Sequence, residues 1–368
     1  MSTVKVGLIG SQFAATLHAE AFAQLASGEI VAAASPTKAH VEEFARAHHI
    51  PQTFTDYKQL LAVPEIELVC ISVPNHLHCQ VATEALAAGK HVVIEKPLCL
   101  TLEEADRMIA AAKAAGKPLL YAENLLFTPK YVRVKQLIEQ GAVGKVVRVR
   151  QTEKHSGPHS PWFWDVDRSG GGALFDMGCH GFAFGRWLLG SPAVKSVWAS
   201  CNLLLHSGRT RGDDDSIFVV EFDNGAVLQV EDSWIKLGGM EDTAEVFGSG
   251  GAIYCDITRG NSMNVYSSDG YGYAVEKADT TKGWTFAIYE ENWQYGYPAE
   301  MKHFVDVVRG KVEPVVTAED GRLVLEVMFA AYESAATGKR IDFPYKPAHP
   351  GRPIESWLRA RGGGAAKA

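Results

Sequence analysis

Short, wholly apolar runs alternate with longer amphipathic stretches through the first third of the chain. A run that is apolar at every position is typical of a strand buried on both faces, and an amphipathic stretch is typical of a helix that covers such a sheet. The pattern therefore predicts a doubly wound parallel sheet of the α/β class. The expected strands are 4–10, 30–35, 68–73, 91–97 and 119–124, and the expected helices are 14–26, 37–47, 76–88 and 102–115.

After residue 124 the pattern changes to strand-like runs separated by turn residues. Asn224-Gly225 lies between two alternating runs, and Asn-Gly in that setting is the strongest short signal for a hairpin. This half is therefore expected to be an α+β domain with an open, mostly antiparallel sheet. Its expected strands are 146–154, 216–223, 226–235, 243–248 and 252–256, and its expected helices are 127–140, 173–189, 298–309 and 318–337.

Length and composition limit the class of protein. A chain of 368 residues exceeds what one hydrophobic core usually supports, so we expect one domain over 1–122, a second over 123–345 and a frayed tail over 346–368. The net charge is −7 and the basic residues are scattered, which argues against a nucleic-acid partner. The start of the chain lacks the features of a secretory signal and no apolar run is long enough to span a bilayer, so a cytoplasmic protein without membrane contact is expected.

The six cysteines contain no C-x-x-C pair and no spacing that would bring four ligands to one metal. We expect them to be reduced, mostly buried thiols. His155 and His159 could be taken for two metal ligands, but no third ligand of suitable spacing is near. No metal is therefore expected.

A glycine-containing turn joins the first expected strand to the first expected helix. At this position a dinucleotide pyrophosphate meets a helix amino terminus, so Gly10, Gln12, Phe13 and Ala14 are candidates to bind one. The motif is imperfect, because Gln12 stands where the second glycine would let the backbone approach the pyrophosphate. A generic corner between a strand and a helix is the alternative.

The end of the second strand bears on the choice of cofactor. An NAD enzyme often has Asp or Glu here for the ribose hydroxyls, and this chain has Ser35, Thr37 and Lys38 instead. The two hydroxyls can bond ribose, and Lys38 could meet a 2′-phosphate, but no arginine is present to clamp one. The sequence favours NAD and leaves NADP open.

Three further strand ends carry polar side chains, and carboxyl ends of parallel strands are where such sheets bind ligands. Asn75 could instead cap the following helix, whereas a charged Glu95-Lys96 pair at the end of a buried strand has no easy structural explanation. A cis Lys96–Pro97 bond would explain the proline that follows this pair. The expected cofactor contacts at these ends are Pro74, Asn75, His78, Glu95, Lys96 and Asn124.

A second motif follows in the later half, Gly170-Gly171-Gly172-Ala173-Leu174-x-Asp176-x-Gly178-x-His180. Together with the glycine turn, Pro74-Asn75-x-x-His78 and Glu95-Lys96-Pro97, it resembles the glucose–fructose oxidoreductase, inositol dehydrogenase and rhizopine catabolism (Gfo/Idh/MocA) family from Val4 to about Phe343. The resemblance implies a Rossmann domain for dinucleotide binding and a second domain for substrate binding. It also implies oligomer contacts through the second sheet, here a homodimer or homotetramer, and NAD(P)-linked chemistry on sugars, inositols or related alcohols.

Hydride transfer from a secondary alcohol requires a group that takes the hydroxyl proton. Asp176 and His180 are four residues apart on an expected helix and would share one polar edge; the alternative is an ordinary Asp–His pair on a solvated helix face. The resemblance implies that Lys96 binds the substrate hydroxyl and the nicotinamide ribose. It further implies that Asp176 holds the substrate or orients the histidine, and that His180 is the acid–base. Which of Lys96 and His180 moves the proton stays open.

An aromatic loop precedes the triple glycine and contains side chains of the kind that hold sugars: His155, Trp162 and Trp164. The alternative is a rigid loop that only packs on the second domain. Tyr297, before the 298–309 helix, is a further candidate for the pocket wall. Sequence thus predicts a dehydrogenase acting on a sugar, glycoside or polyol. The rivals are a keto-sugar reductase, a glycoside-oxidising enzyme that keeps and recycles bound NAD, and a non-catalytic cofactor-binding sensor.

Overall fold

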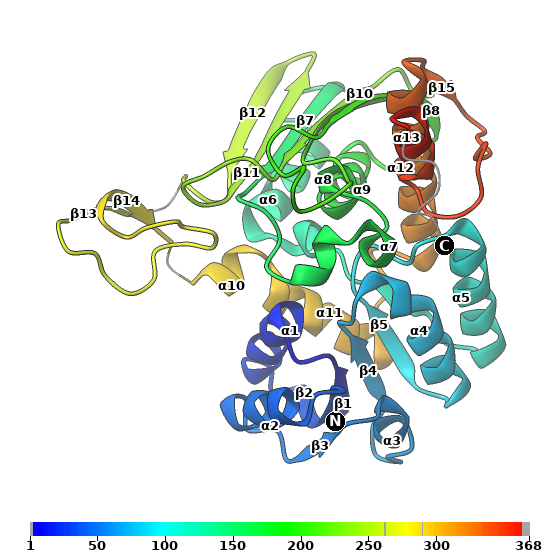
Figure 1. Cartoon of the computed structure of the whole chain (residues 1–368), viewed down its shortest axis with the longest axis vertical. Helices are drawn as coiled ribbons and strands as arrows, with labels where there is room; N and C mark the ends of the chain where they lie inside the picture. Colours follow the sequence, from blue (N-terminus) through cyan, green and yellow to red (C-terminus); the bar gives the residue numbers. More distant parts are fainter. Residues whose placement is uncertain (1–2, 261–262, 289, 363–368) are drawn as a thin grey trace. The chain divides into compact units, whose positions relative to one another are not determined.

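The computed structural model describes residues 3–260, 263–288 and 290–362, and within them the chain forms two compact units (Figure 1). Unit 1 takes the chain up to Thr128 and the later segment Tyr295–Leu323. Unit 2 takes Pro129–Gln294 and the chain from Val324 onward. This division differs from the one drawn from the sequence at 122/123, because a late segment of the chain packs back on unit 1.

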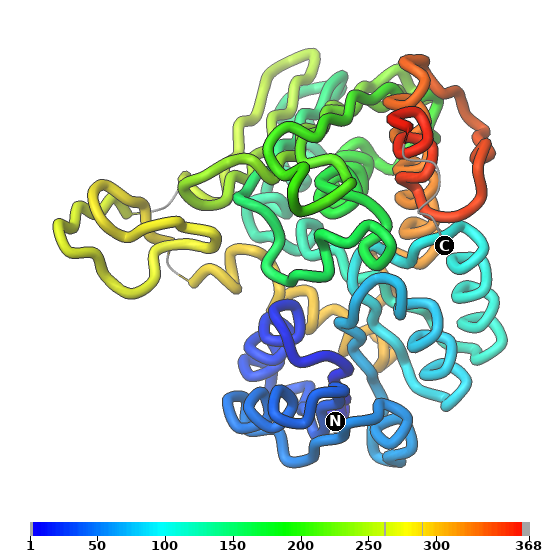
Figure 2. Tube along the Cα trace, in the orientation of Figure 1, coloured from blue at the N-terminus to red at the C-terminus, as the bar shows by residue number. Residues whose placement is uncertain are grey.

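The core of unit 1 explains why the late segment Tyr295–Leu323 belongs to this unit. Helix α11, Tyr297–Val308, places Met301, Phe304 and Val305 in the same buried cluster as Val6 of the first strand. In Figure 2 the yellow-orange α11 lies beside the blue α1, Phe13–Ala23. Burial of three large apolar side chains contributes on the order of 5 kcal/mol, which attaches this segment to the parallel-sheet unit.

Unit 1 contains the expected doubly wound sheet. Its six strands are all parallel, in the order β3-β2-β1-β4-β5-β6. The strands are β1 Val4–Ile9, β2 Gly28–Ala34, β3 Gln52–Phe54, β4 Leu68–Ile71, β5 His91–Ile94 and β6 Leu119–Tyr121. The helices between them are α1, α2 Lys38–Ala47, α3 Tyr57–Leu61, α4 His78–Ala87 and α5 Leu102–Ala115, with short 3₁₀ turns η1 Asn75–Leu77 and η2 Asn124–Phe127. The five expected strands are confirmed, whereas β3 and α3 were not expected.

Local signals account for the element ends that the sequence located well. Helix α5 begins with a capping box, in which the Thr101 hydroxyl accepts the Glu104 N–H and the Glu104 carboxylate accepts the Thr101 N–H. It ends at Gly116, whose φ of 63° belongs to the left-handed region that favours glycine. These ends position the strands whose carboxyl termini form the candidate site.

Unit 2 is built on a seven-stranded sheet in the order β12-β11-β7-β10-β9-β8-β15. Only the β7–β10 pair is parallel, so the expectation of an α+β unit with a mostly antiparallel sheet is confirmed. The expected hairpin is present, because Gly225 has a φ of 82° and the Phe222 N–H donates to the Ala226 carbonyl across the turn. The strands are β7 Val146–Lys154, β8 Val194–Asn202, β9 Asp215–Phe222, β10 Val227–Ser233, β11 Glu241–Gly248, β12 Gly251–Asp256 and β15 Ile341–Asp342.

The remaining elements of this half are helices, 3₁₀ turns and a separate two-stranded hairpin. They are α6 Pro129–Glu139, η3 Pro161–Trp164, α7 Val166–Ser169, α8 Ala173–Asp176, α9 Gly178–Leu188, β13 Met263–Ser267, β14 Gly283–Ala287, α10 Glu291–Gln294, α12 Ala318–Thr337 and α13 Glu355–Ala360. Helix α12 begins in the last part of unit 1 and continues in unit 2.

Two expectations for this half were wrong. The expected single helix over 173–189 is interrupted at Met177, whose φ of −107° separates α8 from α9. The tail was expected to fray from residue 346, yet Ile354, Trp357 and Leu358 are buried around α13. Apolar side chains in this stretch bury enough surface to hold it. The expected frayed end at 363–368 lies outside the described residues.

Candidate active site

The turn between β1 and α1 has the geometry of a nucleotide-binding corner. Gly10 has a φ of 124°, and a Cβ built on it would lie 2.3 Å from the Ser72 carbonyl oxygen, so only glycine fits. Gln12 is the N-cap of α1 and makes no capping hydrogen bond with its side chain. The first turn of α1, with Phe13 and Ala14, thus presents its N–H groups at the carboxyl end of β1, as an anion site requires.

The end of β2 holds the three candidate ribose contacts. Ser35 is half-buried, while Thr37 is exposed and caps α2 without a side-chain hydrogen bond. The Lys38 ammonium lies 3.7 Å from the Glu42 carboxylate one turn along α2. A negative charge beside Lys38 disfavours a 2′-phosphate at this position.

The loops that follow β4 and β5 are joined by a buried histidine. The two ring nitrogens of His78 lie 2.9 Å from the Pro97 and Val73 carbonyl oxygens, and burial lowers the pKa of the ring. Lys96–Pro97 is cis, as expected. Asn75, beside Pro74, is buried and begins η1 rather than capping α4, so the capping alternative was wrong. His78 therefore aligns the two strand ends that carry Asn75 and Lys96.

The residue before Lys96 belongs to a buried network that the sequence reading missed. The Glu95 carboxylate lies 2.7 Å from Nε2 of the fully buried His18 on α1, and it also accepts the Lys96 N–H at 3.1 Å. This links the nucleotide-binding helix to the end of β5. A lone histidine within an apolar helix was the available signal.

Two more carboxyl groups are buried in unit 1. Glu123 and Glu300 are both fully inaccessible to solvent. Burial raises the pKa of Glu300 well above its usual range, and the charges of Glu95 and Glu123 raise it further. The Glu300 carboxyl is therefore harder to ionise than an exposed glutamate.

We expect the Glu300→Gln variant to gain stability relative to the parent as the pH rises. A carboxyl whose pKa is raised on folding contributes stability below its unfolded pKa of about 4.5, and that contribution is lost as the pH rises through the folded value. Glutamine cannot ionise and avoids the loss. Urea unfolding at pH 5, 7 and 8.5 measures the difference, with Glu103→Gln on the exposed face of α5 as the control. A Glu300→Gln difference that is equal at all three pH values would contradict the assignment.

Asn124 and Tyr297 occupy the last candidate positions in unit 1. Asn124 is buried at the start of η2 and donates its side-chain N–H to the Tyr295 carbonyl at 2.9 Å. Tyr297 begins α11, with its ring 6.3 Å from that of His18. Tyr297 therefore lies near the histidine that meets Glu95, and Asn124 fixes the backbone just before α11.

In unit 2, Asp176 ends α8 and His180 lies in the first turn of α9. Both side chains are buried, 8% and 7% exposed, so the alternative of a solvated helix face was wrong. The Asp176 carboxylate accepts the indole N–H of the fully buried Trp234 at 3.3 Å. The Trp234 indole therefore holds the Asp176 carboxylate in place inside unit 2.

Three glycines allow α9 to pack closely on the sheet. A Cβ on Gly181 would lie 2.4 Å from a Val230 methyl carbon, and one on Gly185 would lie 2.3 Å from Leu228 on the same strand. At Gly178 the nearest atom would be the Asp232 carboxylate oxygen, at 2.9 Å. This glycine seam fixes the helix that carries His180.

The triple-glycine turn is held by one aspartate. Asp213, fully buried, accepts the N–H of Gly172 at 3.2 Å, the N–H of Leu174 at 2.7 Å and the hydroxyl of Tyr332 at 2.6 Å. Burial raises the pKa of Asp213 to about 6, although these three hydrogen bonds lower it. These hydrogen bonds fix the backbone of the turn that precedes Asp176.

A row of acidic side chains crosses the helix-facing side of the same sheet. Asp242 and Asp232 both pair in register with Glu153, on the strands either side of β7, and all three are buried. Burial is the largest cause that raises the pKa of Asp232 well above its usual range. The nearby charges of Asp213 and Asp176 raise it further. The sequence reading placed no function on this row, because single acidic residues in alternating strands look like solvent-facing positions.

The aromatic loop after β7 is ordered by its own contacts. His155 is buried and its Nδ1 accepts the Gly157 N–H at 3.0 Å. Trp162 stacks on Phe163, while Trp164 meets Trp234 edge to face at 5.1 Å between ring centres. Of the three candidate substrate contacts in this loop, Trp164 therefore adjoins the indole that binds Asp176.

Within the described ranges, no group of three or more His, Cys, Asp or Glu side chains is arranged to hold a metal ion. None of the six cysteines, all in that part of the chain, forms a disulfide, and five are buried. No helix among the described residues has the length and apolar character needed to cross a membrane.

Comparisons with known proteins match both units. Residues 4–123 match the Gfo/Idh/MocA family model described as an oxidoreductase family with an NAD-binding Rossmann fold, and residues 131–254 match the C-terminal domain model of the same group. The levoglucosan dehydrogenase of Pseudarthrobacter phenanthrenivorans is 32% identical over 305 residues, covering 73% of this chain and 78% of that protein.

Two further proteins are similar over nearly the whole length. The myo-inositol 2-dehydrogenase of Thermotoga maritima is 27% identical over 333 residues, covering 90% of this chain and 96% of that protein. The crystal structure of GenD2 from gentamicin A biosynthesis, in complex with NAD, has a TM-score of 0.88 at 29% identity, covering 94% of this chain and 97% of that one.

Proposed function

The chain belongs to the Gfo/Idh/MocA family of oxidoreductases, and from that premise we propose that it transfers hydride between NAD and a secondary hydroxyl of a sugar, glycoside or inositol-like polyol. Its NAD-binding Rossmann unit and its similarity to sugar and polyol dehydrogenases support the class of reaction. The observation that carries the proposal is the buried Asp176–His180 pair on the glycine-packed helices, together with Lys96 at the end of a buried strand.

The proposal gives each of these residues a defined role. Lys96 binds the reacting hydroxyl and the nicotinamide ribose, His180 takes or returns the hydroxyl proton, and Asp176 orients the substrate. The Gly10 turn and the first turn of α1 hold the pyrophosphate. NAD, when bound, supplies the hydride acceptor. The Trp234 indole and Asp213 keep the Asp176 backbone and carboxylate in place.

The His155, Trp162 and Trp164 loop is proposed to contact the sugar, with Tyr297 as a further wall. Indole faces pack on the C–H faces of a sugar ring, and a buried imidazole can bond its hydroxyls. Pro161 is exposed and Trp164 is buried, although both lie in the same 3₁₀ turn. This difference supports a loop that presents only one of its sides to the substrate.

A cofactor-reduction screen tests the function. Purified protein is incubated with NAD and with monosaccharides, anhydrosugars, inositols and glucosides, and absorbance at 340 nm is followed. Growth of the signal with at least one class supports the dehydrogenase. Loss of signal with NADH and keto sugars would indicate the reductase. Exchange of hydride between two sugars without free NADH would indicate a retained cofactor, and saturable sugar binding without any turnover would indicate a sensor.

We expect NAD to be preferred over NADP by at least about 10-fold in kcat/KM, because the Glu42 carboxylate beside Lys38 repels a 2′-phosphate. The Glu42→Gln variant should narrow that preference, and Glu43→Gln, the exposed neighbour, should leave it unchanged. Initial rates with both cofactors measure the ratio. Equal ratios in the parent and the Glu42→Gln variant would remove Glu42 from the explanation.

The sheet of unit 2 is proposed to form the contacts of a homodimer or homotetramer. Trp198 is 43% exposed on the face opposite the one covered by α9, and register places it beside Val219. Light scattering should give an oligomer for the parent and a smaller species for Trp198→Glu. Trp284→Glu, at an aromatic side chain exposed elsewhere in unit 2, is the control and should keep the parent mass. A monomeric parent would refute the proposal.

A further inference from the structure

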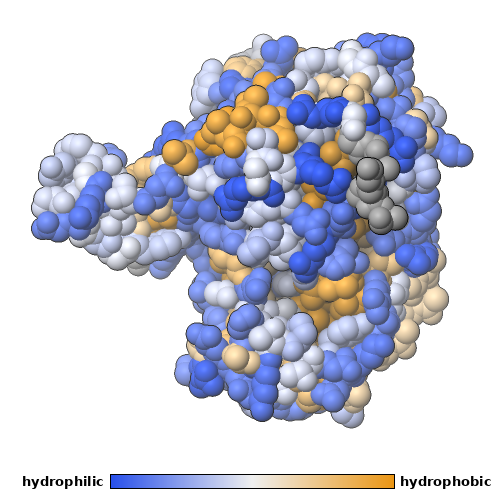
Figure 3. All heavy atoms as spheres, in the orientation of Figure 1, coloured by the Kyte–Doolittle hydropathy of each residue, from blue (hydrophilic) through white to orange (hydrophobic). Residues whose placement is uncertain are grey.

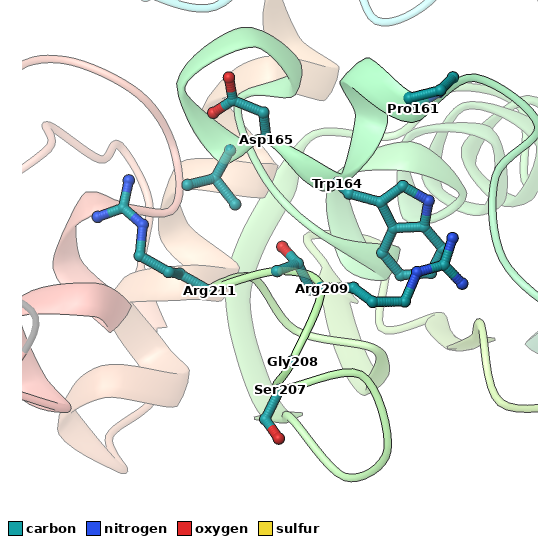
Figure 4. A pocket seen from close by; sticks show the side chains of 9 residues that line it. Pro161, Trp164, Asp165, Ser207, Gly208, Arg209 and Arg211 are labelled. Carbon is teal, nitrogen blue, oxygen red and sulfur yellow. The ribbon is translucent and has the colours of Figure 1, made fainter.

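A pocket of about 420 Å³ opens in unit 2 between η3 and the loop that follows β8 (Figure 4). Its wall combines an indole, two guanidinium groups, a hydroxyl and a carboxylate. The side chains that matter below are those of Trp164, Asp165, Ser207, Arg209 and Arg211. None of them was assigned a role by the sequence reading except Trp164.

Arg209 is the unusual member of this wall. Its guanidinium lies over the Trp164 ring, 3.8 Å from the ring centre, and Figure 4 shows the two groups face to face. Among the described residues none forms an ion pair or a side-chain hydrogen bond with this guanidinium. Stacking fixes the orientation of an arginine without using its N–H donors, so the fork is left for a planar oxyanion.

The loop that carries Arg209 is built without help from a ligand. The fully buried Asp214 carboxylate accepts the N–H groups of Leu204, Leu205 and His206 at 2.7, 2.8 and 2.8 Å. The His206 ring adds a contact of 3.2 Å to the Trp234 carbonyl. A loop ordered in this way loses little conformational entropy when a ligand binds.

The charged side chains of the pocket wall are two guanidinium groups and the Asp165 carboxylate. Arg211 is paired with Asp167 at 3.1 Å, and the Asp165 carboxylate accepts the Asp167 N–H at 3.0 Å. Among the described residues no ion pair joins Arg209 to either carboxylate, and Figure 4 shows the Ser207 hydroxyl directed away from the Arg209 guanidinium. An arginine fork typically binds carboxylate or phosphate through two parallel hydrogen bonds.

The pocket is two aromatic rings away from the candidate catalytic aspartate. Trp164 contacts Trp234 at 5.1 Å between ring centres, and the Trp234 indole donates to Asp176. A ligand on Arg209 would therefore rest on the first ring of this connection. In addition, Trp164 supplies an optical signal for binding there.

We propose that the Arg209 pocket binds a carboxylate or phosphate group. This extends the function proposed above, on which only the kinetic part of the test rests. The group is carried either by an acidic substrate or by a separate small anion, and the chemistry of recognition is the same in both cases.

Binding is tested on the whole chain without NAD. Inorganic phosphate and methyl glucuronide are titrated at low ionic strength, with methyl glucoside as the neutral twin, and heat and tryptophan fluorescence are recorded. We expect saturable binding of at least one of the two anions in the millimolar range and at least about 10-fold weaker binding in Arg209→Gln. Arg168→Gln, on α7 and outside the pocket wall, should bind as the parent does. Anion binding that is absent, or equal in parent and Arg209→Gln, would overturn the proposal.

Kinetics with NAD separate the two sources of the anion. If the substrate carries it, the parent oxidises the glucuronide with a higher kcat/KM than the glucoside, and Arg209→Gln lowers that ratio at least about 10-fold. If a separate anion binds, phosphate changes the KM for the glucoside in the parent and loses this effect in Arg209→Gln. Oxidation of both sugars without any Arg209-dependent effect of anions would refute the pocket and leave the dehydrogenase standing. Arg209-dependent phosphate binding without any sugar oxidation would support the pocket and refute the proposed dehydrogenase.

Discussion

The Lys96→Met variant should lose at least about 1,000-fold in kcat, while its affinity for NAD should fall by no more than about 10-fold, because the proposed pyrophosphate contacts at the Gly10 turn remain. Methionine has a similar length and fills the same volume at the end of β5, so the fold is expected to persist. The methionine side chain, however, carries no charge and has no proton donor for the substrate hydroxyl. Steady-state rates with the substrate found in the screen, and calorimetric titration of NAD, measure the two quantities. Lys113→Met on the exposed face of α5 is the control.

A double variant tests whether Lys96 and His180 act on the same hydroxyl. Residues that act as a unit in catalysis show strongly non-additive losses. Lys96→Met combined with His180→Asn should therefore cost little more than the larger single loss. Penalties that multiply, or a Lys96→Met variant with near-parent kcat, would refute the assignment.

Gly172→Ala should destabilise the chain by several kcal/mol, on the order of 3 or more. A Cβ at this position would lie 2.0 Å from the Asp213 carbonyl oxygen and 2.6 Å from the Asp213 nitrogen. Both are backbone atoms and cannot rotate away, so α8 or the start of β9 would have to move. Asp213 would then lose its bonds to the Gly172 and Leu174 N–H groups.

Denaturant unfolding and the yield of folded protein measure this effect. Gly272→Ala is the matched control, because a Cβ there meets no atom within 4 Å and no unusual φ is involved. It should change the free energy of unfolding by less than about 0.5 kcal/mol. A Gly172→Ala variant as stable as the control would show that the turn is less tightly packed than described.

The parallel sheet and its strand ends could be predicted because their signals are local. Wholly apolar runs identified five of the six strands, and the placement of Lys96 and Asn75 followed from where those runs stop. The Asn224-Gly225 turn was found for the same reason. Strand β3 was missed because its exposed Thr53 and half-buried flanks lack an apolar run.

The parts that could not be predicted depend on contacts between distant segments. Helix α11 looks like any amphipathic helix, and only the packing of Phe304 and Val305 shows that it belongs to unit 1. Gly178 follows the break at Met177, but Gly181 and Gly185 lie inside α9, so glycine alone does not identify the break from sequence. The roles of Glu300 and Asp232 could not be inferred either, since an isolated acidic residue is usually solvated and burial is a tertiary property.

The exposed surface raises a separate point about what sequence can show. Figure 3 shows orange, apolar patches among blue, hydrophilic ones on the face that it draws. Large apolar side chains with high exposure include Leu204, Leu205, Leu237 and Trp284. Single exposed apolar side chains are ordinary for a folded chain, whereas contiguous patches of them indicate an interface.

The glycine seam between α9 and β10 bears on how this protein could acquire new specificities. Because Gly181 and Gly185 bring the α9 backbone directly onto the Val230 and Leu228 side chains, the helix cannot slide or tilt its histidine toward a differently shaped ligand without collision. We therefore expect selection for another sugar to act on the 155–165 loop, because loops tolerate changes in length and sequence better than packed helices do. Grafting that loop from a relative is expected to change the substrate selectivity and to leave the proposed catalytic residues unchanged.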